Sequence, residues 1–307
     1  MSPRIASCLV LPPLIWGSLV VVATGALSRL DPARLTLWTW TIGGLLLLPA
    51  AWRNRRAVAA AVRARPAWFL VVGTAGTTGF QYFWYLGLAS ASAIDVVLLT
   101  AALPLFICIG DWFCGARFGA GRWAGLACAA VGCVLLGLPA GGQFDIAQSM
   151  GAAAILVANL GMTLYTVALG QRPTGLRADA GLAALVWPGL AVFAAALLLT
   201  GNLSAFAAPD PQDADLWMEL LYIGGAAYVL AYALWNTSVL VSGAARTGMF
   251  LYLQPVFAIL LAAALLGETP GPLQLIAGLL ILGGLLVSDL LAARHAAVAA
   301  AEDGALP

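Results

Sequence analysis

The stretch FWYLGLASASAIDVVLLTAALPLF (residues 83–106) decides the fold, because it returns in altered form as LWNTSVLVSGAARTGMFLYLQPVF (residues 234–257). The two copies lie 151 positions apart and share few identical residues. The matching residues are those that are bulky or that constrain the backbone. Trp84 pairs with Trp235 and Pro104 with Pro255. After one extra residue in the second copy, Gly115 pairs with Gly267 and Gly132 with Gly284. Self-similarity at a fixed offset indicates an internal duplication.

The chain around this repeat is too apolar for a surface that faces water. Of its 307 residues 63% are hydrophobic and 9% are charged, and the mean hydropathy is +0.98. A soluble domain carries roughly 25% charged residues. A membrane-spanning helix needs about 20 apolar residues, and ten runs approach that length: 5–27, 33–52, 67–88, 92–111, 121–138, 148–169, 178–200, 216–238, 244–266 and 271–293. The first run is too long for a signal peptide, so it counts as a span.

The repeat divides these ten runs into two sets of five. Because five is odd, the second copy enters the membrane in the opposite orientation. Proteins with inverted repeats of this kind hold their substrate near the middle of the membrane, between the halves. The predicted fold is therefore an all-α integral membrane protein, with ten transmembrane helices in two inverted five-helix repeats around a central cavity. The repeats cover residues 1–138 and 139–293, and residues 294–307 form a C-terminal tail.

The basic residues give the orientation. All fourteen are arginine, and with the N-terminus inside twelve of them fall on the cytoplasmic side. Only Arg29 and Arg34 fall outside, and that same side collects the acidic residues Asp145, Asp210, Asp213, Asp215 and Glu268. Positive residues accumulate on the side that is not translocated. We therefore expect both termini to be cytoplasmic. The one short arginine-rich segment, 53–65, is predicted to be a loop between two spans and is no basis for nucleic-acid binding.

Nothing in the sequence predicts a metal site, a cofactor or an enzyme. The five cysteines lie in predicted spans or, for Cys114, just after one, in no CxxC pattern, and the one histidine, His295, lies in the tail. A metal needs convergent ligands, and a membrane enzyme needs a nucleophile, a base or a metal. Asp95 is a weak candidate for a proton site, so proton-coupled and facilitated export both stay open.

The segment YVLAYALWN (residues 228–236) carries the first candidate functional residues. Tyr228, Tyr232, Trp235 and Asn236 share one helical face, because they are spaced i, i+4, i+7 and i+8. The repeat has bulky or polar residues at the matching positions of the run 67–88. We expect these groups to flank opposite mouths of one cavity, the gate candidates being Gln81, Trp84, Tyr85, Tyr232, Trp235 and Asn236. The alternative is that both groups face lipid at the interfaces.

Between these mouths we expect a substrate cavity lined by polar and aromatic side chains at mid-span: Trp16, Thr100, Asn159, Tyr228, Tyr252 and Gln254. The alternative for the two amides is interhelical hydrogen bonding, worth roughly 0.6 kcal/mol per contact. Paired rings contribute about 0.5–1.5 kcal/mol beyond area burial, and an ammonium over a ring face a similar amount. A zwitterionic amino acid offers both features. The spans hold no buried Arg or Lys that would bind a phosphate.

These anchors resemble the drug/metabolite transporter superfamily, and within it the EamA-type ten-helix exporters. WGS at residues 16–18 is similar to the start of the family's first helix, and YLQPVFAILLAAALLGETPGPLQLIAG (residues 252–278) to the pattern that closes each repeat. The first copy, GARFGAG, lacks the glutamate found at Glu268. AYALWN resembles a segment of the family's aromatic amino-acid exporters. The resemblance implies a bacterial inner-membrane exporter with a central cavity.

The sequence thus predicts an exporter of small amphipathic metabolites, above all aromatic or bulky amino acids, that works by alternating access. An exporter of drugs or other metabolites with the same cavity is the first alternative, and a membrane enzyme is a disfavoured second. The expected partners are a small-molecule substrate and the lipid bilayer, with no nucleic acid, and a monomer is the expected assembly.

The arginine distribution makes a prediction about topology. A cysteine placed in the loop 201–215 should react with a membrane-impermeant thiol reagent in whole cells, and one placed within 53–65 should not. Labelling of the second position without the first would reverse the orientation.

Overall fold

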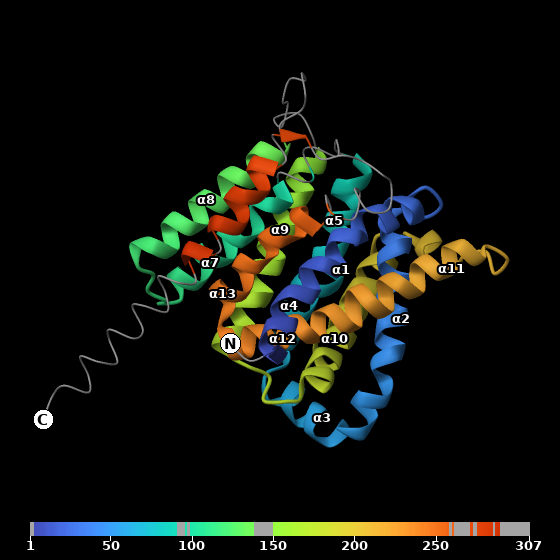
Figure 1. Cartoon of the computed structure of the whole chain (residues 1–307). Coiled ribbons are helices and arrows are strands. Elements are labelled where there is room, and N and C mark those ends of the chain that lie inside the picture. The colour runs from blue at the N-terminus through green and yellow to red at the C-terminus, as the bar shows by residue number, and fades with distance from the viewer. Residues whose placement is uncertain are drawn as a thin grey trace, which may run out of the picture.

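The computed structural model describes residues 3–90, 96, 99–137, 150–257, 260, 271–272, 275–284 and 286–288, and the regular structure in them is helical (Figure 1). The α-helices are α1 (Pro3–Leu27), α2 (Pro32–Arg53), α3 (Arg55–Ala64), α4 (Pro66–Thr74), α5 (Phe80–Ser90), α7 (Leu103–Phe113), α8 (Ala120–Gly137), α9 (Met150–Gln171), α10 (Ala178–Leu199), α11 (Ala214–Leu221), α12 (Ala231–Ser242) and α13 (Ala244–Met249). Two segments are π-helical, η1 (Ala75–Gly79) and η3 (Tyr222–Leu230), and two are 3-10 helices, η2 (Leu203–Phe206) and η4 (Phe250–Tyr252). Asp95, Glu268, His295 and the tail 294–307 lie outside the described residues.

Several of these helices can cross a membrane. Within the described ranges, five are long and apolar enough: Ile5–Leu27, Pro32–Arg53, Met150–Gln171, Ala178–Leu199 and Ala214–Ser242. The bent pair Arg55–Ala64 and Pro66–Ser90, whose parts meet at 97°, makes a sixth if it is counted as one span. Leu99–Phe113 and Leu275–Ser288 are shorter apolar helices. The chain is therefore an all-helical, multi-pass membrane protein.

The helix bounds follow the apolar runs of the sequence closely. The predicted runs 33–52, 148–169 and 178–200 appear as α2, α9 and α10, and the run 216–238 appears within α11–η3–α12. The agreement has a physical cause. A backbone in hydrocarbon has no water to bond with, so it stays helical until it reaches the interface.

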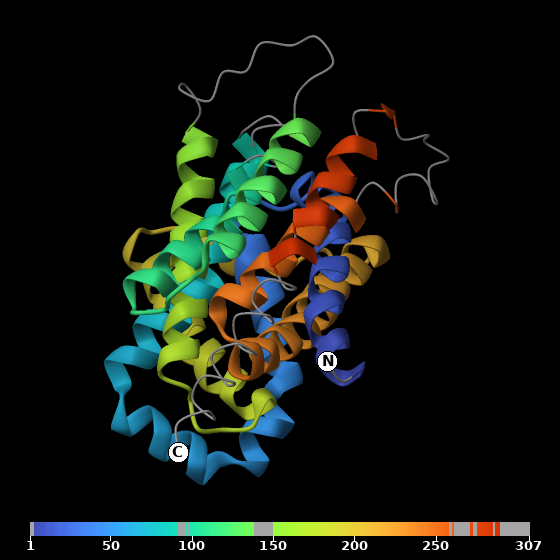
Figure 2. The same cartoon turned by 60° about the vertical axis from the view of Figure 1, so that its left-hand side comes forward.

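The arginine-rich segment 53–65, predicted as a loop, is instead largely the helix α3. Its residues are mainly alanine and arginine, which favour helix. Val58 and Val62 pack partly against the core, and no residue of α3 is buried. In Figures 1 and 2 this helix lies across the lower end of the bundle. The segment is thus an amphipathic surface helix.

Proline removes a backbone donor, so the sequence predicts that Pro12–Pro13 interrupts the first run and that Pro104, near the middle of the run 92–111, bends its helix; the structure differs at both places. α1 continues through Pro12 and Pro13 without a break. The predicted run 92–111 is broken by a turn at Ala102, which leaves Pro104 in the first turn of α7. Proline is well suited to that position, because the first residues of a helix need no N–H partner. It marks a helix start here, where the sequence suggested a kink.

The two π-helical segments are related by the internal repeat. Residues 226–230 of η3 are the repeat mates of η1, at the offset of 151. Both segments run through glycine-rich stretches where neighbouring helices come close. A Cβ on Gly76 would collide with the ring of Tyr165, and one on Gly161 would lie 2.5 Å from the Ala75 carbonyl oxygen. Small residues allow such close approach in membrane bundles.

The arginines predicted to lie outside, Arg29 and Arg34, tie the α1–α2 connection and the first turn of α2 to α11 and the segment before it. The Arg29 guanidinium contacts Asp213 at 2.9 Å and Glu219 at 2.6 Å. Arg34 donates to the carbonyl oxygens of Ala207, at 2.9 Å, and Ala208. We call this set of contacts the end latch. The end latch explains why Arg29 and Arg34 lie apart from the other arginines, since each of the two has polar partners at its own end of the molecule.

The end latch gives a prediction about pH. The Leu216 N–H bond and the Arg29 guanidinium together hold the pKa of the Asp213 carboxyl below its usual value. A lowered pKa stabilises the folded state above the unfolded value, about 3.9, and that contribution disappears as the pH falls through the folded-state pKa. Arg29→Ala should therefore lower the melting temperature of the detergent-solubilised protein at pH 7, with a difference that shrinks toward pH 3.

The matched control is Arg177→Ala. Arg177 is largely exposed and pairs with the nearby Asp179 at 3.5 Å, and among the described residues this pair joins no separate segments. It should shift the melting temperature less than Arg29→Ala at pH 7. Equal shifts, or a pH-independent effect of Arg29→Ala, would show that the latch does not stabilise the fold.

Candidate functional site

Two adjoining chambers lie inside the bundle. The inner chamber contains about 440 Å³ of space between atoms, part of it open to the outside; its lining is Trp16, Leu19, Phe80, Gln81, Trp84, Thr100, Leu103, Met162, Tyr232, Leu251 and Gln254. The side chamber contains about 590 Å³ by the same measure; its lining is Gly17, Val20, Trp84, Val96, Thr100, Ala101, Leu103, Pro104, Leu251, Tyr252, Gln254 and Pro255. No charged side chain is among these described lining residues. The remaining free space is narrow, so a bound ring would have to move the lining rings.

The lining of the inner chamber follows the internal repeat. Three pairs of repeat mates contribute to it, one residue from each copy: Gln81 with Tyr232, Thr100 with Leu251, and Leu103 with Gln254. Residues 151 positions apart thus face the same space. The side chamber adds Pro104 with Pro255, at its own wall. The chambers lie where the two copies of the repeat meet.

Trp16 of α1 lies at the centre of the aromatic lining. Its ring packs edge-on against Tyr232, with centroids 5.5 Å apart, and tilted against Trp235, at 5.4 Å. Its indole Nε1 donates to the carbonyl oxygen of Ala227, at 2.9 Å. The side chain is therefore held by these neighbours while it also lines the chamber.

Both π-helical segments accept a hydrogen bond from a chamber side chain. The Tyr232 hydroxyl donates to the Gly76 carbonyl oxygen in η1, at 2.9 Å, as the Trp16 indole does to Ala227 in η3. A wide π-turn disturbs the regular pairing of the helix backbone. Water is absent inside a membrane bundle, so polar partners for the backbone come from the protein itself. Trp16 and Tyr232 thus serve the backbone and line the chamber at once.

The tyrosines of the predicted stripe do not all reach the chambers. Tyr228 stacks on Trp40, with centroids 4.2 Å apart and planes at 19°, and its hydroxyl lies 2.6 Å from that of Tyr85. Both tyrosines are fully buried. They form a contact behind the chamber wall that joins the two halves of the repeat.

Trp84 and Trp235, the most prominent repeat mates, have different surroundings. Trp84 lines both chambers, and its indole Nε1 lies 3.4 Å from the Thr100 hydroxyl. Trp235 packs behind Trp16 and donates to the Thr166 hydroxyl, at 3.3 Å. Both rings are at most 4% exposed, so neither faces lipid.

The buried amides also differ in their partners. Asn236 accepts from the Tyr165 hydroxyl at 2.8 Å, and Asn159 donates to the Leu99 carbonyl oxygen at 2.6 Å. Gln254 donates to the Trp16 carbonyl oxygen at 3.2 Å. Gln81 is 1% exposed, and its Nε2 makes no hydrogen bond with any described residue. Gln81 alone among these amides lines the inner chamber with its donor group unused.

Seven of the twelve residues singled out from the sequence line a chamber: Trp16, Gln81, Trp84, Thr100, Tyr232, Tyr252 and Gln254. The other five lie outside both linings as described and form the packed shell around them: Tyr85, Asn159, Tyr228, Trp235 and Asn236. Phe80, Met162, Leu103 and Leu251 line the inner chamber without having been singled out. For the last two, the repeat contained the signal, since their mates Gln254 and Thr100 were already candidates.

Comparisons with known proteins agree with this architecture. The chain is similar to the aromatic amino acid exporter YddG of Ancylobacter novellus, at 27% identity over 288 residues, covering 92% of this chain and 95% of that protein. It is similar to an uncharacterized transporter of Archaeoglobus fulgidus, at 24% identity, covering 92% of this chain and 96% of that one. A solved crystal structure shares the fold with a TM-score of 0.76 at 24% identity, over 96% of this chain and 99% of the other.

A family model adds the decisive match. The model of the EamA-like transporter family matches twice, at residues 4–138 and at residues 149–288. Those two matches cover most of the chain, with one match in each half. The protein is therefore a membrane transporter and not an enzyme, and it belongs to the EamA-like transporter family.

Proposed function

We propose that this protein is a ten-helix carrier of the bacterial inner membrane that exports small amphipathic metabolites, above all aromatic or bulky amino acids. Two inverted five-helix repeats, residues 1–138 and 139–293, surround the cavity, and residues 294–307 form a cytoplasmic tail. The observation that carries the proposal is the lining of the inner chamber by repeat mates such as Gln81 and Tyr232. Carriers built from inverted repeats have their substrate site between the repeats.

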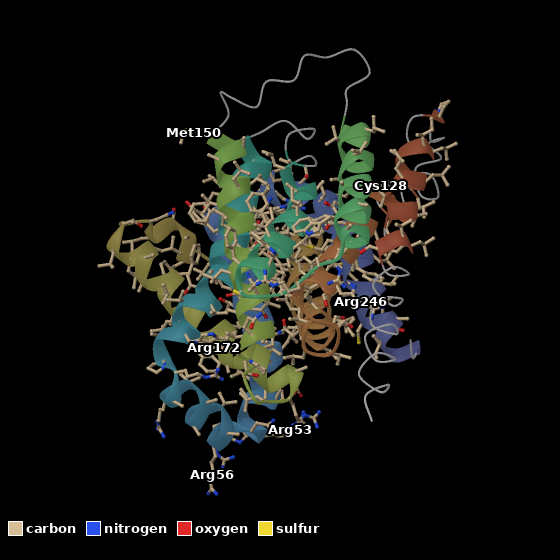
Figure 3. The ribbon with its side chains drawn as sticks, turned by 90° about the vertical axis from the view of Figure 1, so that its left-hand side faces the viewer. Arg53, Arg56, Cys128, Met150, Arg172 and Arg246 are labelled. Carbon is tan, nitrogen blue, oxygen red and sulfur yellow. The ribbon has the colours of Figure 1, made fainter. Side chains whose placement is uncertain are left out.

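The proposed orientation is supported by the location of the arginines. Figure 3 shows Arg53, Arg56 and Arg172 toward the lower end of the molecule, with Met150 toward the other end. The end latch with Arg29 lies at the far end of α2 from α3. The positive-inside rule then favours a cytoplasmic position for the arginine-rich end.

The proposed substrate is supported by the chemistry of the chamber wall. Trp16, Trp84, Phe80 and Tyr232 offer ring faces and edges to a flat apolar group. Ring faces also attract an ammonium group. No described lining residue carries a charge that would select an anion or a cation. The similarity to the exporter YddG points to the same class of substrate.

We further propose that Trp84 and Trp235 belong to closures on opposite sides of the substrate, together with the other gate candidates Gln81, Tyr85, Tyr232 and Asn236. In Figure 1 α5 leads away from the α3 end, whereas α12 runs toward it. Trp84 then closes the periplasmic side and Trp235 the cytoplasmic side. Alternating access requires one side to be packed while the other is open, and large rings suit such closures.

The first test is transport by the purified protein. Proteoliposomes loaded with unlabelled L-phenylalanine or L-tryptophan should accumulate the labelled amino acid by counterflow, and liposomes without protein should not. Overproduction should protect cells from toxic analogues of these amino acids. If only some other solute shows counterflow, the protein is still a carrier, but the proposal of aromatic substrates is wrong.

The second test addresses the closures. Leu251→Cys, in a background without native cysteines, reports from a residue that lines both chambers. Trp84→Ala should raise the reaction of the introduced cysteine with an impermeant thiol reagent severalfold from the periplasmic side, and Trp235→Ala from the cytoplasmic side, because each removes one closing ring.

Trp38→Ala is the matched control. Its indole donates to the Ala207 carbonyl oxygen at 3.1 Å, beside the end latch, and the ring lines neither chamber as described. It should leave the reaction of the introduced cysteine unchanged. If Trp84→Ala and Trp235→Ala fold and change neither the sidedness nor the rate, the two rings only pack the interior.

A further inference from the structure

The unused donor of Gln81 distinguishes it from the other polar groups of the inner chamber. Gln81 lies on α5, its side chain is 1% exposed, and it lines the chamber. Its Nε2 is buried without a hydrogen-bond partner among the described residues. The nearby Tyr85 hydroxyl is already paired with that of Tyr228, and it forms no hydrogen bond of acceptable geometry with this amide nitrogen. Buried polar groups almost always have a partner, so a donor without one calls for an explanation.

Three neighbouring donors of the chamber are engaged within the protein. The Trp16 indole donates to Ala227 and the Tyr232 hydroxyl to Gly76, both at 2.9 Å. The Gln254 amide donates to the Trp16 carbonyl oxygen at 3.2 Å. These groups cannot use the same hydrogen for a ligand without giving up a partner in the protein. The Gln81 amide can donate to a ligand without such a loss, because its nitrogen has no hydrogen-bond partner among the described residues.

The partner that an amide N–H requires is an oxygen or nitrogen atom with a free lone pair. In an amino acid with an apolar side chain, the carboxylate is the group that only accepts hydrogen bonds, whereas the ammonium only donates. No arginine or lysine is among the described lining residues to compete for that carboxylate. The flat remainder of the ligand would meet Trp16, Trp84 and Phe80 in the same chamber.

We propose that Gln81 Nε2 binds the carboxylate of the transported amino acid and thereby determines that the carrier prefers aromatic acids to aromatic amines. The inference rests on the proposed function and adds the orientation of the substrate to it. A neutral donor holds a carboxylate more loosely than an arginine fork would. This suits a carrier that must also release its substrate.

The test compares three indole compounds as ligands of the full-length protein in lipid nanodiscs. L-Tryptophan and indole-3-propionate carry a carboxylate, and tryptamine carries only the ammonium. Gln81→Leu keeps the approximate volume of the side chain and removes the donor. It should weaken binding of the two acids about tenfold or more and leave the binding of tryptamine unchanged.

A second variant makes the test independent of the loss of volume and polarity. Gln81→Glu puts a like charge opposite the carboxylate, so it should weaken the acids further and favour tryptamine. Gln171→Leu is the matched control, because Gln171 lies exposed at the end of α9 and bonds to Asp111 at 3.3 Å. That substitution should not alter the preference among the three ligands.

The outcomes separate this inference from the proposed function. Suppose that the unmodified protein binds tryptophan, and that both Gln81 variants weaken the binding of all three ligands equally or of none of them. Gln81 then does not bind the carboxylate, while the proposal of an aromatic substrate is unaffected. If the unmodified protein binds none of the three, the aromatic substrate class fails and this inference fails with it. Gln81→Asn, a shorter amide, should retain part of the preference for acids and replaces Gln81→Leu should that variant not fold.

Discussion

The structure depends on one constraint: inside the membrane, every backbone N–H and carbonyl must find its partner within the protein. Regular helices meet it without help. At the π-helical segments η1 and η3 the backbone turns are wider than in an α-helix, and side chains of other helices supply further hydrogen bonds to their carbonyl groups. The Tyr232 hydroxyl donates a hydrogen bond to the Gly76 carbonyl oxygen, and the Trp16 indole donates one to the Ala227 carbonyl oxygen. Both rings thus hold a backbone contact and line the inner chamber at the same time.

The packing around these segments follows from the same constraint. A side chain can reach a backbone carbonyl on another helix only where the helices come close. Gly76 leaves room for the Tyr165 ring, and Gly161 allows α9 to approach the Ala75 carbonyl oxygen. The Tyr165 hydroxyl then continues to Asn236. Small residues and large aromatic residues thus form one system, in which the glycines make the space that the rings occupy.

The sequence predicted the parts of the fold that lipid imposes and missed those that depend on local backbone geometry. Span bounds such as those of α2 and α10 follow from length and hydropathy alone. The helix α3 was missed because the prediction searched for long apolar runs, and the arginines of α3 interrupt any such run. Tyr228 was assigned to the cavity face because a regular α-helix was assumed. A π-turn changes the rotation per residue, and Tyr228, within η3, points instead to Trp40 and Tyr85. Asn159 could not be distinguished from a cavity residue, since its partner is a backbone carbonyl that the sequence does not reveal.

The double role of Trp16 and Tyr232 has a consequence for how relatives of this protein could diverge. A substitution at either position changes the ligand's surroundings and also removes a hydrogen bond to a carbonyl in a π-helical segment, so two properties would have to be re-optimised together. Thr100, Leu103 and Leu251 line the same space, and no described backbone group outside their own helices depends on their side chains. New selectivity is therefore easier to evolve or engineer at those three wall positions, with the tryptophan and the tyrosine retained as a fixed scaffold.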